Sequence, residues 1–475
     1  MVADLAIYMV VHQPRRLKLP AQPIPRRASI EDIARCLFDE RLNERYFHKV
    51  ARTCYYPAAR MFLELARAGM RLSLGCSLSF VRQAQQWDPE LLALFRELVA
   101  EDNVELIGVE PHHSFLFLLD ISTFVLRMRW MADEMERIFG KRPTITDTTE
   151  MSMSSLLYNA LDAAGFRGAL LDGRAWVMDW RESTHLYQAS DEEPLPAAGQ
   201  KTTPVQATSR RARRLVADDE RENAPSLLAR HLQLSDDVGY RFTNRSWSNY
   251  PLYVETYADW IAQARGDFVF LGWDFETFGE HHRRDSGIFE FMRALPGALE
   301  RRGISTQTPS TLIERYSAAG QVYHLPLPVY PSTWAGSGGM EFFLGNAAQQ
   351  EIFRLMDYVY SMAKLTENPD ALDLALWLAQ SDNLHLIQWF GRSGPEADVS
   401  RYFTPEEWWQ LGAQRIITEQ RQVYFNALNA LEPYLPARLI RQARRKSAAR
   451  VPRRKTPLTA PESDFVAHKS LQEIE

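Results

Sequence analysis

Short apolar runs alternate with stretches of helical spacing over the first 319 residues, and this alternation constrains the fold more than any other feature of the chain. The runs have the length of buried strands, and the stretches between them are long enough for helices. Strands that alternate with helices form a parallel sheet, because each helix returns the chain to the start of the next strand. The expected strands are 5–11, 71–75, 103–109, 142–147, 168–171 and 268–272.

The pattern becomes helical after about residue 320. Apolar residues recur at helical spacing in three later segments. The last of these begins with the N-cap residue Thr404, a proline and two glutamates, which is a helix-start signature. These three segments are 345–365, 370–380 and 405–431. We therefore predict a β/α domain over 1–319 and a helical subdomain over 320–440.

Two segments break these patterns. Residues 191–225 are rich in Pro, Ala, Thr and Arg and poor in large apolar side chains, which predicts a loop-like insertion. Its arginine cluster, 210–214, fits a solvated loop better than a binding patch. Residues 441–475 form a basic tail that we expect to be disordered, with weak contact to an acidic surface as the alternative.

The bulk composition excludes several classes of partner. A net charge of -5 gives no reason to expect nucleic acid. The 3 cysteines are an odd number without metal spacing, which argues against a disulfide framework and for a reducing, cytoplasmic compartment. The N-terminal run carries Asp4 and lacks a basic region, so it reads as a strand and not a signal peptide. No apolar run reaches the roughly 20 residues that a membrane span requires.

The segment 271–282 is the strongest functional signal. It continues a buried strand and then delivers three carboxylates and two histidines within nine residues. Burying an unpaired charge is costly, so acids at the end of an apolar strand need a reason. In a barrel of parallel strands, the carboxyl ends of the strands carry the chemistry. If the strand continues, Asp274 and Glu276 share one face.

Glu150 supplies a second acid at the end of a predicted strand. Cleavage of a glycosidic bond with retention needs two carboxyl groups, one ionised to attack and one protonated to release the leaving oxygen. The hydroxyl residues Thr148 and Thr149 could hold Glu150 ionised, and Trp273 could raise the pKa of Asp274 by lowering the local polarity. Alternatively, Glu150 is an ordinary acid at a helix start.

Histidines near these strand ends are weaker signals. His12 follows the first strand and could equally be a satisfied core residue. The pair His112 and His113 suggests a metal site at first sight. Adjacent side chains on an extended chain point in opposite directions, however, so the two cannot easily share one ion. No His-x-x-x-His spacing occurs in the chain, so zinc-dependent hydrolysis is poorly supported.

Four short motifs together resemble those of glycoside hydrolase family 57. They are His-Gln-Pro at 12–14, Gly-Val-Glu-Pro-His-His-Ser at 108–114, Thr-Thr-Glu at 148–150 and Trp-Asp-Phe-Glu-Thr-Phe-Gly-Glu-His at 273–281. The last motif is the most specific, and its sequence is most similar to that of the alpha-amylase-like subgroup. The stretch 232–242 is also similar to a segment of that subgroup. The resemblance spans about residues 4–392. It implies an incomplete, seven-stranded parallel β/α barrel followed by a helical subdomain.

The resemblance also implies roles for individual residues. Glu150 matches the nucleophile and Asp274 the general acid/base of the family, and no metal or organic cofactor is implied. His12, His113 and Glu276 are expected to hold sugar hydroxyls or to orient the acids. Trp273 and Asp382 complete the matching positions that could contact substrate. Trp334 and Trp389 are candidate stacking platforms, each about equally able to be core.

The fifth family motif departs from its pattern. The sequence reads Gln-Ser-Asp-Asn-Leu-His over 380–385, so Asn383 stands where a histidine is expected. The sugar contact is then lost or moved to His385. The tryptophan loop at 331–339 is also unusually rich in glycine, which could change substrate preference.

The expected function is therefore a retaining hydrolase of α-1,4-linked glucans or maltooligosaccharides. The alternatives are a 4-alpha-glucanotransferase or branching-type transglycosylase, and a catalytically weak glucan-binding protein on the same scaffold. Metal-dependent deacetylation on a related barrel is a further alternative. Oligomeric state is not indicated by the sequence.

Overall fold

The computed structural model describes residues 2–190 and 224–438, so the predicted insertion (apart from its last two residues) and the basic tail lie outside the described residues. Ten strands occur in the described part of the chain. They are β1 (Asp4–Val11), β2 (Leu72–Cys76), β3 (Val104–Ile107), β4 (Ile145–Thr146), β5 (Gly168–Asp172), β6 (Leu186–Ser190), β7 (Ser226–Arg230), β8 (Phe268–Asp274), β9 (Ser305–Gln307) and β10 (Val322–Pro326). All six strands expected from the apolar runs are present.

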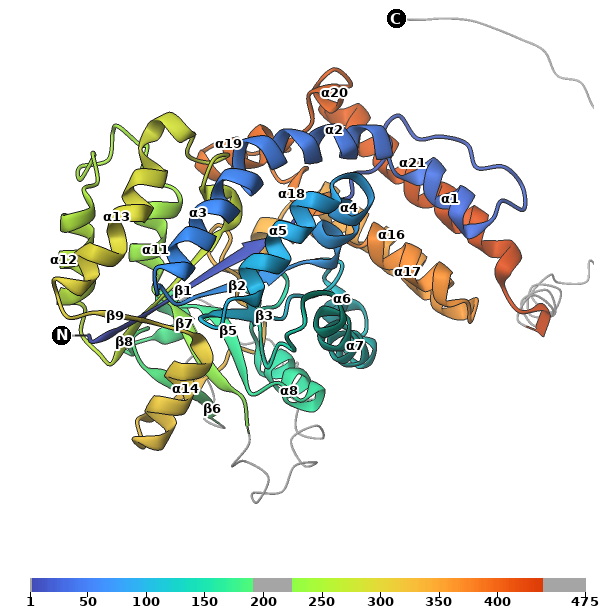
Figure 1. Cartoon of the computed structure of the whole chain (residues 1–475). Helices are drawn as coiled ribbons and strands as arrows, with labels where there is room; N and C mark the ends of the chain where they lie inside the picture. The colour runs from blue at the N-terminus through green and yellow to red at the C-terminus, as the bar shows by residue number, and fades with distance from the viewer. Residues whose placement is uncertain (1, 191–223, 439–475) are drawn as a thin grey trace, which may run out of the picture.

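The strands form two five-stranded sheets that together make a curled, mainly parallel sheet (Figure 1). One sheet has the order β3-β2-β1-β8, with β9 on β1, and the other has the order β10-β6-β7-β5-β4. An isolated parallel bridge between Gly108 and Thr146 joins β3 to β4. On the other side, His231 donates its backbone N–H to the carbonyl oxygen of Phe270 over 2.7 Å. The fold is therefore α/β as predicted, although the hydrogen-bonding pattern divides the strands into two sheets and includes one antiparallel pair, β6 with β7.

Strand β1 shows why the sheet is buried on both faces. All eight of its residues are buried, and its side chains alternate between two apolar clusters. Tyr8 and Val10 belong to the cluster inside the curl, whereas Ile7 and Met9 belong to the larger cluster between the sheet and the surrounding helices. Continuous apolar runs are typical of parallel strands that are covered on both faces.

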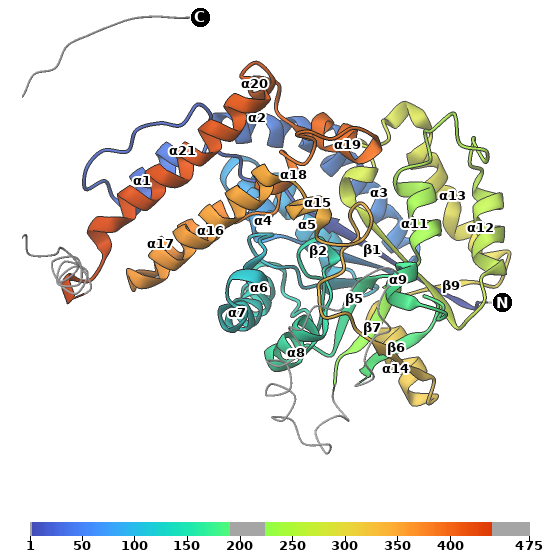
Figure 2. The ribbon, with the colours of Figure 1, turned by 180° about the vertical axis from the view of Figure 1, so that it is seen from behind.

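The helices between the strands surround the curled sheet, except α1, which lies beside α21 (Figures 1 and 2). They are α1 (Ile30–Leu37), α2 (Glu40–Val50), α3 (Tyr56–Arg67), α4 (Leu78–Trp87), α5 (Pro89–Ala100), α6 (Leu116–Leu119), α7 (Ile121–Phe139), α8 (Ser155–Ala164), α9 (Ala175–Met178), α11 (Leu232–Gly239), α12 (Val254–Gln263), α13 (Ile288–Glu300) and α14 (Pro309–Ala318). Their ends follow local chemistry. Gly165, for example, has φ 89° and closes α8, as its position in the sequence suggested.

The elements after β10 are all helical. They are α15 (Glu341–Leu344), α16 (Ala347–Leu365), α17 (Pro369–Leu378), α18 (Asp382–His385), α19 (Pro395–Phe403), α20 (Glu406–Trp409), α21 (Ala413–Leu431) and the 3-10 turn η6 (Glu432–Tyr434). Helix α16 is fixed at its start by a capping box between Asn346 and Gln349. The single helix predicted over 405–431 is wrong, because Gly412 has φ 77° and separates α20 from α21.

The helical region is not separate from the rest of the chain. Strand β10 pairs with β6, so the sheet extends beyond residue 319. Helix α1, from the N-terminal part of the chain, packs against α17 and α21, and both views show it beside α21 (Figures 1 and 2). Helices α16, α17 and α21 pack against one another in this layer. The C-terminal helices thus lie over one end of the curled sheet.

Candidate active site

Glu150 lies in a strained turn directly after β4. It belongs to the 3-10 turn η2 (Thr149–Met151), with φ 58° and ψ 33°, and Met151 also has a positive φ of 51°. Non-glycine residues in this region of backbone space cost about 1–3 kcal/mol each and cluster at functional sites. The backbone of Glu150 is held from outside, since its carbonyl oxygen accepts a 3.1 Å hydrogen bond from the N–H of Trp334. The turn therefore aims one carboxyl group at a fixed place.

Two distant residues hold the carboxyl group of Glu150. Trp334 donates its Nε1–H to Oε2 over 2.9 Å, and Ser381 donates its hydroxyl to Oε1 over 3.2 Å. Such bonds favour the ionised carboxylate. The expectation that Thr148 and Thr149 would play this part is wrong, because both hydroxyls donate to backbone carbonyl oxygens.

Asp274 is the last residue of β8. It is in register with Val10, which belongs to the cluster inside the curl, so its side chain lies on that inner face. Trp273 is in register with Met9 on the outer face. It is 2% exposed, and its Nε1–H donates to the carbonyl oxygen of Ser235. Trp273 is therefore a core residue in this structure, and its placement does not suit the expected substrate contact.

The strand was expected to continue to Glu276, but it ends at Asp274. A 3-10 turn, η4 (Phe275–Thr277), follows Asp274 directly, so strand alternation does not set the direction of Glu276. The carboxyl group of Glu276 instead accepts a 2.8 Å hydrogen bond from the hydroxyl of Tyr55. Burial and the neighbouring charge of Asp274 raise the pKa of Glu276 to about 8. Two acids of one motif thus remain close enough to interact.

Burial shapes the titration of the two principal acids. It raises the pKa of Glu150 to about 8, and although the Trp334 hydrogen bond lowers it, the charge of Asp274 raises it further. Burial also raises the pKa of Asp274 to about 6, against the lowering effects of Arg230 and His12. Carboxyl groups that interact in this way share protons and titrate as a pair. Between these two values the pair holds one proton.

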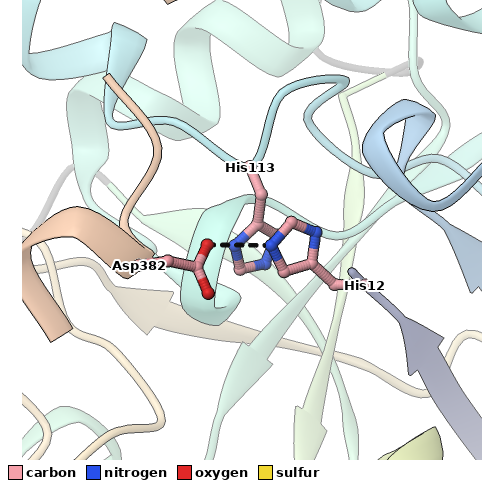
Figure 3. A group of neighbouring side chains, drawn as sticks. All are labelled: His12, His113 and Asp382. Carbon is pink, nitrogen blue, oxygen red and sulfur yellow. Dashed lines mark hydrogen bonds and ion pairs between the residues drawn. The ribbon is translucent and has the colours of Figure 1, made fainter. Parts of the chain in front are cut away.

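His12, His113 and Asp382 gather beside this pair from three separate parts of the chain (Figure 3). The His12 and His113 rings stack with centroids 4.1 Å apart, and His12 Nε2 lies 2.9 Å from Asp382 Oδ2. His113 Nδ1 lies 3.0 Å from the hydroxyl of Ser381, which also contacts Glu150. Although burial alone would raise it, the charge of His12 and its hydrogen bond hold the pKa of Asp382 well below its usual range. An ionised aspartate therefore stands in the site.

The same three residues could offer a metal ion one ligand atom each, and these atoms lie within 4.8 Å of one another. Their geometry does not fit a divalent metal. A histidine lone pair lies in the plane of its ring, and the His12 and His113 planes differ by only 17° while the rings are stacked. Two such planes do not meet at a point about 2 Å from both nitrogens. Both His12 nitrogens also have partners already, since Nδ1 lies 2.9 Å from the Ser77 hydroxyl.

His112 points away from this cluster. Its Nε2 lies 2.9 Å from Asp373 Oδ1, and its ring meets Trp377 edge-on. The two adjacent histidines therefore do face different surroundings, as their spacing had suggested.

The altered fifth motif divides between the site and the core. Asp382 faces His12, whereas Asn383 is 2% exposed and donates to the carbonyl oxygen of Leu378. His385 is close enough for its charge to lower the pKa of His113, and its Nε2 is buried without a partner among the described residues. Trp389 stacks on Trp409 at 5.1 Å within the helical region. These positions place Asn383 and Trp389 in packing roles.

Sequence reasoning did not find three residues that shape the site. Arg230 ends β7 and is 3% exposed. Its guanidinium donates to Asp172, Asp236 and the carbonyl oxygen of Gly272. The other two are Ser381, described above, and Tyr240, whose pKa is raised by burial and by the charge of Asp274. A charged residue at a strand end was the available signal for Arg230, as it was for Asp274.

The comparisons with known proteins agree with this fold. The sequence profile described as glycosyl hydrolase family 57 matches residues 6–326. The chain belongs to this family of enzymes. It is 28% identical over 378 residues to a Methanocaldococcus jannaschii protein named "Putative alpha-amylase", covering 77% of this chain and 73% of that protein.

Two solved structures share the fold. A 4-alpha-glucanotransferase from Thermococcus litoralis superposes with a TM-score of 0.59 at 13% identity, over 92% of this chain and 60% of the other. A GH57-type branching enzyme from Pyrococcus horikoshii superposes with a TM-score of 0.56 at 15% identity, over 92% and 97%. This chain thus spans 60% of the length of the glucanotransferase. Among the described helices, none is both long and apolar enough to cross a membrane.

Proposed function

We propose that the protein is a retaining glycoside hydrolase that acts on α-1,4-linked glucans. The observation that supports this proposal is a pair of buried acids, Glu150 and Asp274, which follow β4 and end β8, with the charge of Asp274 adding to burial in raising the pKa of Glu150. The names of the relatives support the substrate class, since they are an alpha-amylase, a 4-alpha-glucanotransferase and a branching enzyme.

The proposed reaction has two displacements. Glu150 attacks the anomeric carbon as a carboxylate, and Asp274 gives its proton to the glycosidic oxygen as that bond breaks. Asp274 then removes a proton from water as the water displaces Glu150 and releases the sugar. Each step exchanges one bond at the anomeric carbon, and the proton returns to Asp274. The scheme needs no metal or cofactor.

The hydrogen bonds support this division of roles. Glu150 is held by Trp334 and Ser381, which suits a nucleophile that must keep one position. None of the described residues donates a hydrogen bond to Asp274, which leaves its carboxyl group free to reach a leaving oxygen. In the substrate-free site the pKa of Glu150, about 8, exceeds that of Asp274, about 6. The reactive arrangement is therefore the less populated of the two one-proton forms.

Several neighbours are proposed to hold the sugar. Ionised Asp382 and its partner His12 can bind a pair of sugar hydroxyls, and His113 can bind another next to Ser381. Glu276, which lies in the same motif as Asp274, is also proposed to bind a sugar hydroxyl. His385 is the remaining candidate in the fifth motif, because its Nε2 lacks a partner among the described residues.

Trp334 has a different part. Its indole N–H is committed to Glu150, so we propose that it positions the nucleophile. A ring in this place can also stack on a pyranose.

A glycosyl transferase is the second candidate function. The glucanotransferase and the branching enzyme share the fold, and the same two acids serve both reactions. The difference is whether water or a sugar hydroxyl displaces Glu150. Product analysis on maltoheptaose separates them: hydrolysis gives shorter sugars alone, and transfer gives shorter and longer sugars together.

The test of the central proposal uses Glu150→Gln and Asp274→Asn, with Glu314→Gln as a control. Glu314 is a surface acid with a 66% exposed side chain on α14, so its change matches the chemistry without touching the site. Both site variants should lose at least ~100-fold in kcat on amylose, and the control should match wild type. Proton NMR of the first product should show the α anomer. Unchanged activity in both site variants would show that Glu150 and Asp274 are not the catalytic pair, no cleavage by any of the proteins would mean a glucan-binding protein, and a β anomer would mean inversion.

A further inference from the structure

A strongly basic cavity lies beside the loop that follows Glu276. It has a volume of about 600 Å³. The π-helical turn η1 (Ala51–Tyr55) and its neighbours α2 and α3 form one wall, and the loop 279–285 forms the other. Five cationic side chains line it, namely Lys49, Arg52, Arg60, Arg283 and Arg284.

The positive charge of this cavity is not neutralised by its own acids. Only two carboxylates, Glu280 and Asp285, are among its lining residues. Glu280 is already engaged, since it accepts a 2.9 Å hydrogen bond from Lys49 and another from the hydroxyl of Thr53. Asp285 is then the only carboxylate of the lining that is left to neutralise its four arginines.

Three of the arginines are free to bind a ligand. In the described part of the chain, Arg52, Arg283 and Arg284 make no side-chain hydrogen bond or ion pair, and Arg60 lies over the ring of Tyr56. Guanidinium groups with unused donors in one concave space form a site for an anion, and their planar fork matches the oxygens of a phosphoryl group.

The backbone brings the two walls of the cavity together. A Cβ atom on Gly279 would lie 2.0 Å from the carbonyl oxygen of Thr53, and its φ is 126°. Only glycine allows this approach, which holds the loop arginines opposite Arg52 of the π-helical turn. Short π-helical segments are rare and often occur at functional sites. The arginines therefore surround one space because two unusual backbone features place them there.

The basic cavity adjoins a larger one that approaches His385 of the fifth motif. The larger cavity, of about 770 Å³, shares Glu280, Arg283 and Asp285 with it. It is also lined by Tyr240, which stacks on His281 with centroids 6.0 Å apart. Phe403 also lines the larger cavity, and its ring centroid lies 6.1 Å from that of His385, a candidate sugar-binding residue. A ligand could thus hold its phosphoryl group in the basic cavity and its sugar in the aromatic one.

We propose that the basic cavity binds the phosphoryl group of a phosphorylated sugar. Its volume is within the range of small-molecule sites, and its lining offers more cation than its own acids can use. The phosphoryl part rests on the arginines alone. The sugar part rests on the proposed function, because it is argued from the neighbouring cavity near His385.

Isothermal titration calorimetry on the full chain at low salt tests the proposal, with glucose 6-phosphate, inorganic phosphate and glucose as probes. We expect glucose 6-phosphate to bind at least ~10-fold more tightly than either of the others, since it alone can use both cavities. The double variant Arg283→Gln/Arg284→Gln should weaken its binding by ~10-fold or more, because charged hydrogen bonds are lost. Arg52→Gln should weaken it as well. Arg354→Gln, on the exposed surface of α16, is the control and should bind as wild type does.

The outcomes are separable from those of the catalytic test. No heat with glucose 6-phosphate, or equal loss in the Arg354→Gln control, would overturn the proposal. Equal affinity for phosphate and glucose 6-phosphate would overturn its sugar part and identify a free-phosphate site. If binding fails while amylose is still cleaved, this inference is wrong and the proposed function stands. If glucose 6-phosphate binds but amylose is not cleaved, this inference stands and the proposed function is wrong.

Discussion

Replacing Trp334 with phenylalanine separates two roles that the wild-type residue could combine. Phenylalanine keeps an aromatic face for stacking but removes the Nε1–H that donates to Glu150 over 2.9 Å. If Trp334 is mainly a stacking platform, the variant should retain most of its turnover. If it positions the nucleophile, turnover should fall even though the ring remains.

The size of the effect follows from the hydrogen bond. A hydrogen bond to a charged group contributes about 1.5–3 kcal/mol. Its loss disfavours the ionised carboxylate, so the pKa of Glu150 should rise by about 1–2 units above its value of about 8. If the attacking carboxylate loses the same stabilisation energy, kcat should fall ~10–100-fold. Ser381 still donates to the other oxygen, so activity should not disappear.

The assay is kcat and KM on maltoheptaose over a range of pH, with Trp389→Phe as the matched control. Trp389 donates its Nε1–H to the Thr404 hydroxyl in the helical region, so its replacement removes the same bond away from the acids. The control should lower the melting temperature slightly and leave kcat unchanged. A Trp334→Phe variant with wild-type kcat and a raised KM would refute the positioning role and favour stacking.

Three further predictions concern titration and packing. The pH profile of kcat/KM should be bell-shaped with limits near pH 6 and pH 8, because Glu150 and Asp274 share one proton only between their pKa values; a flat profile from pH 4 to 10 would contradict the pairing. Asn383→His should lower the free energy of unfolding in urea by about 1–3 kcal/mol without raising activity, because the side chain is 2% exposed and faces the helices; a gain in kcat would show that the position reaches the sugar. Gly279→Ala should lower the melting temperature, because its Cβ would collide with the carbonyl oxygen of Thr53. An unchanged melting curve would mean that the loop can move away.

The strands of the first half of the chain could be predicted because both faces of the sheet are buried. A strand such as β1, with all eight residues buried, leaves a continuous apolar run that the sequence displays directly. Strands β6 and β10 lack this signal. Three of the five residues of β6 are half-buried, and in β10 only Leu325 is fully buried, so neither forms an apolar run. Both were missed for that reason.

The two candidate acids could be chosen from the sequence, but the residues that hold Glu150 could not. Glu150 and Asp274 are acidic residues that follow apolar, strand-like runs. The donors to Glu150, Trp334 and Ser381, lie 184 and 231 residues away, and no local pattern reports a contact over such a separation. The nearby hydroxyls of Thr148 and Thr149 were the natural sequence-based choice.

The site is therefore built from two parts of the chain. The ends of the sheet supply the acids, Glu150 and Asp274, whereas residues after β10 supply the groups that hold Glu150, since Trp334 and Ser381 both donate to it. The strained backbone of Glu150 fits this division, because a left-handed turn persists only when its surroundings hold it in place. It also explains how the fifth motif can vary. Of its residues, Ser381 donates to Glu150 while Asn383 donates to the carbonyl oxygen of Leu378, so a change at Asn383 leaves the bonds to Glu150 in place.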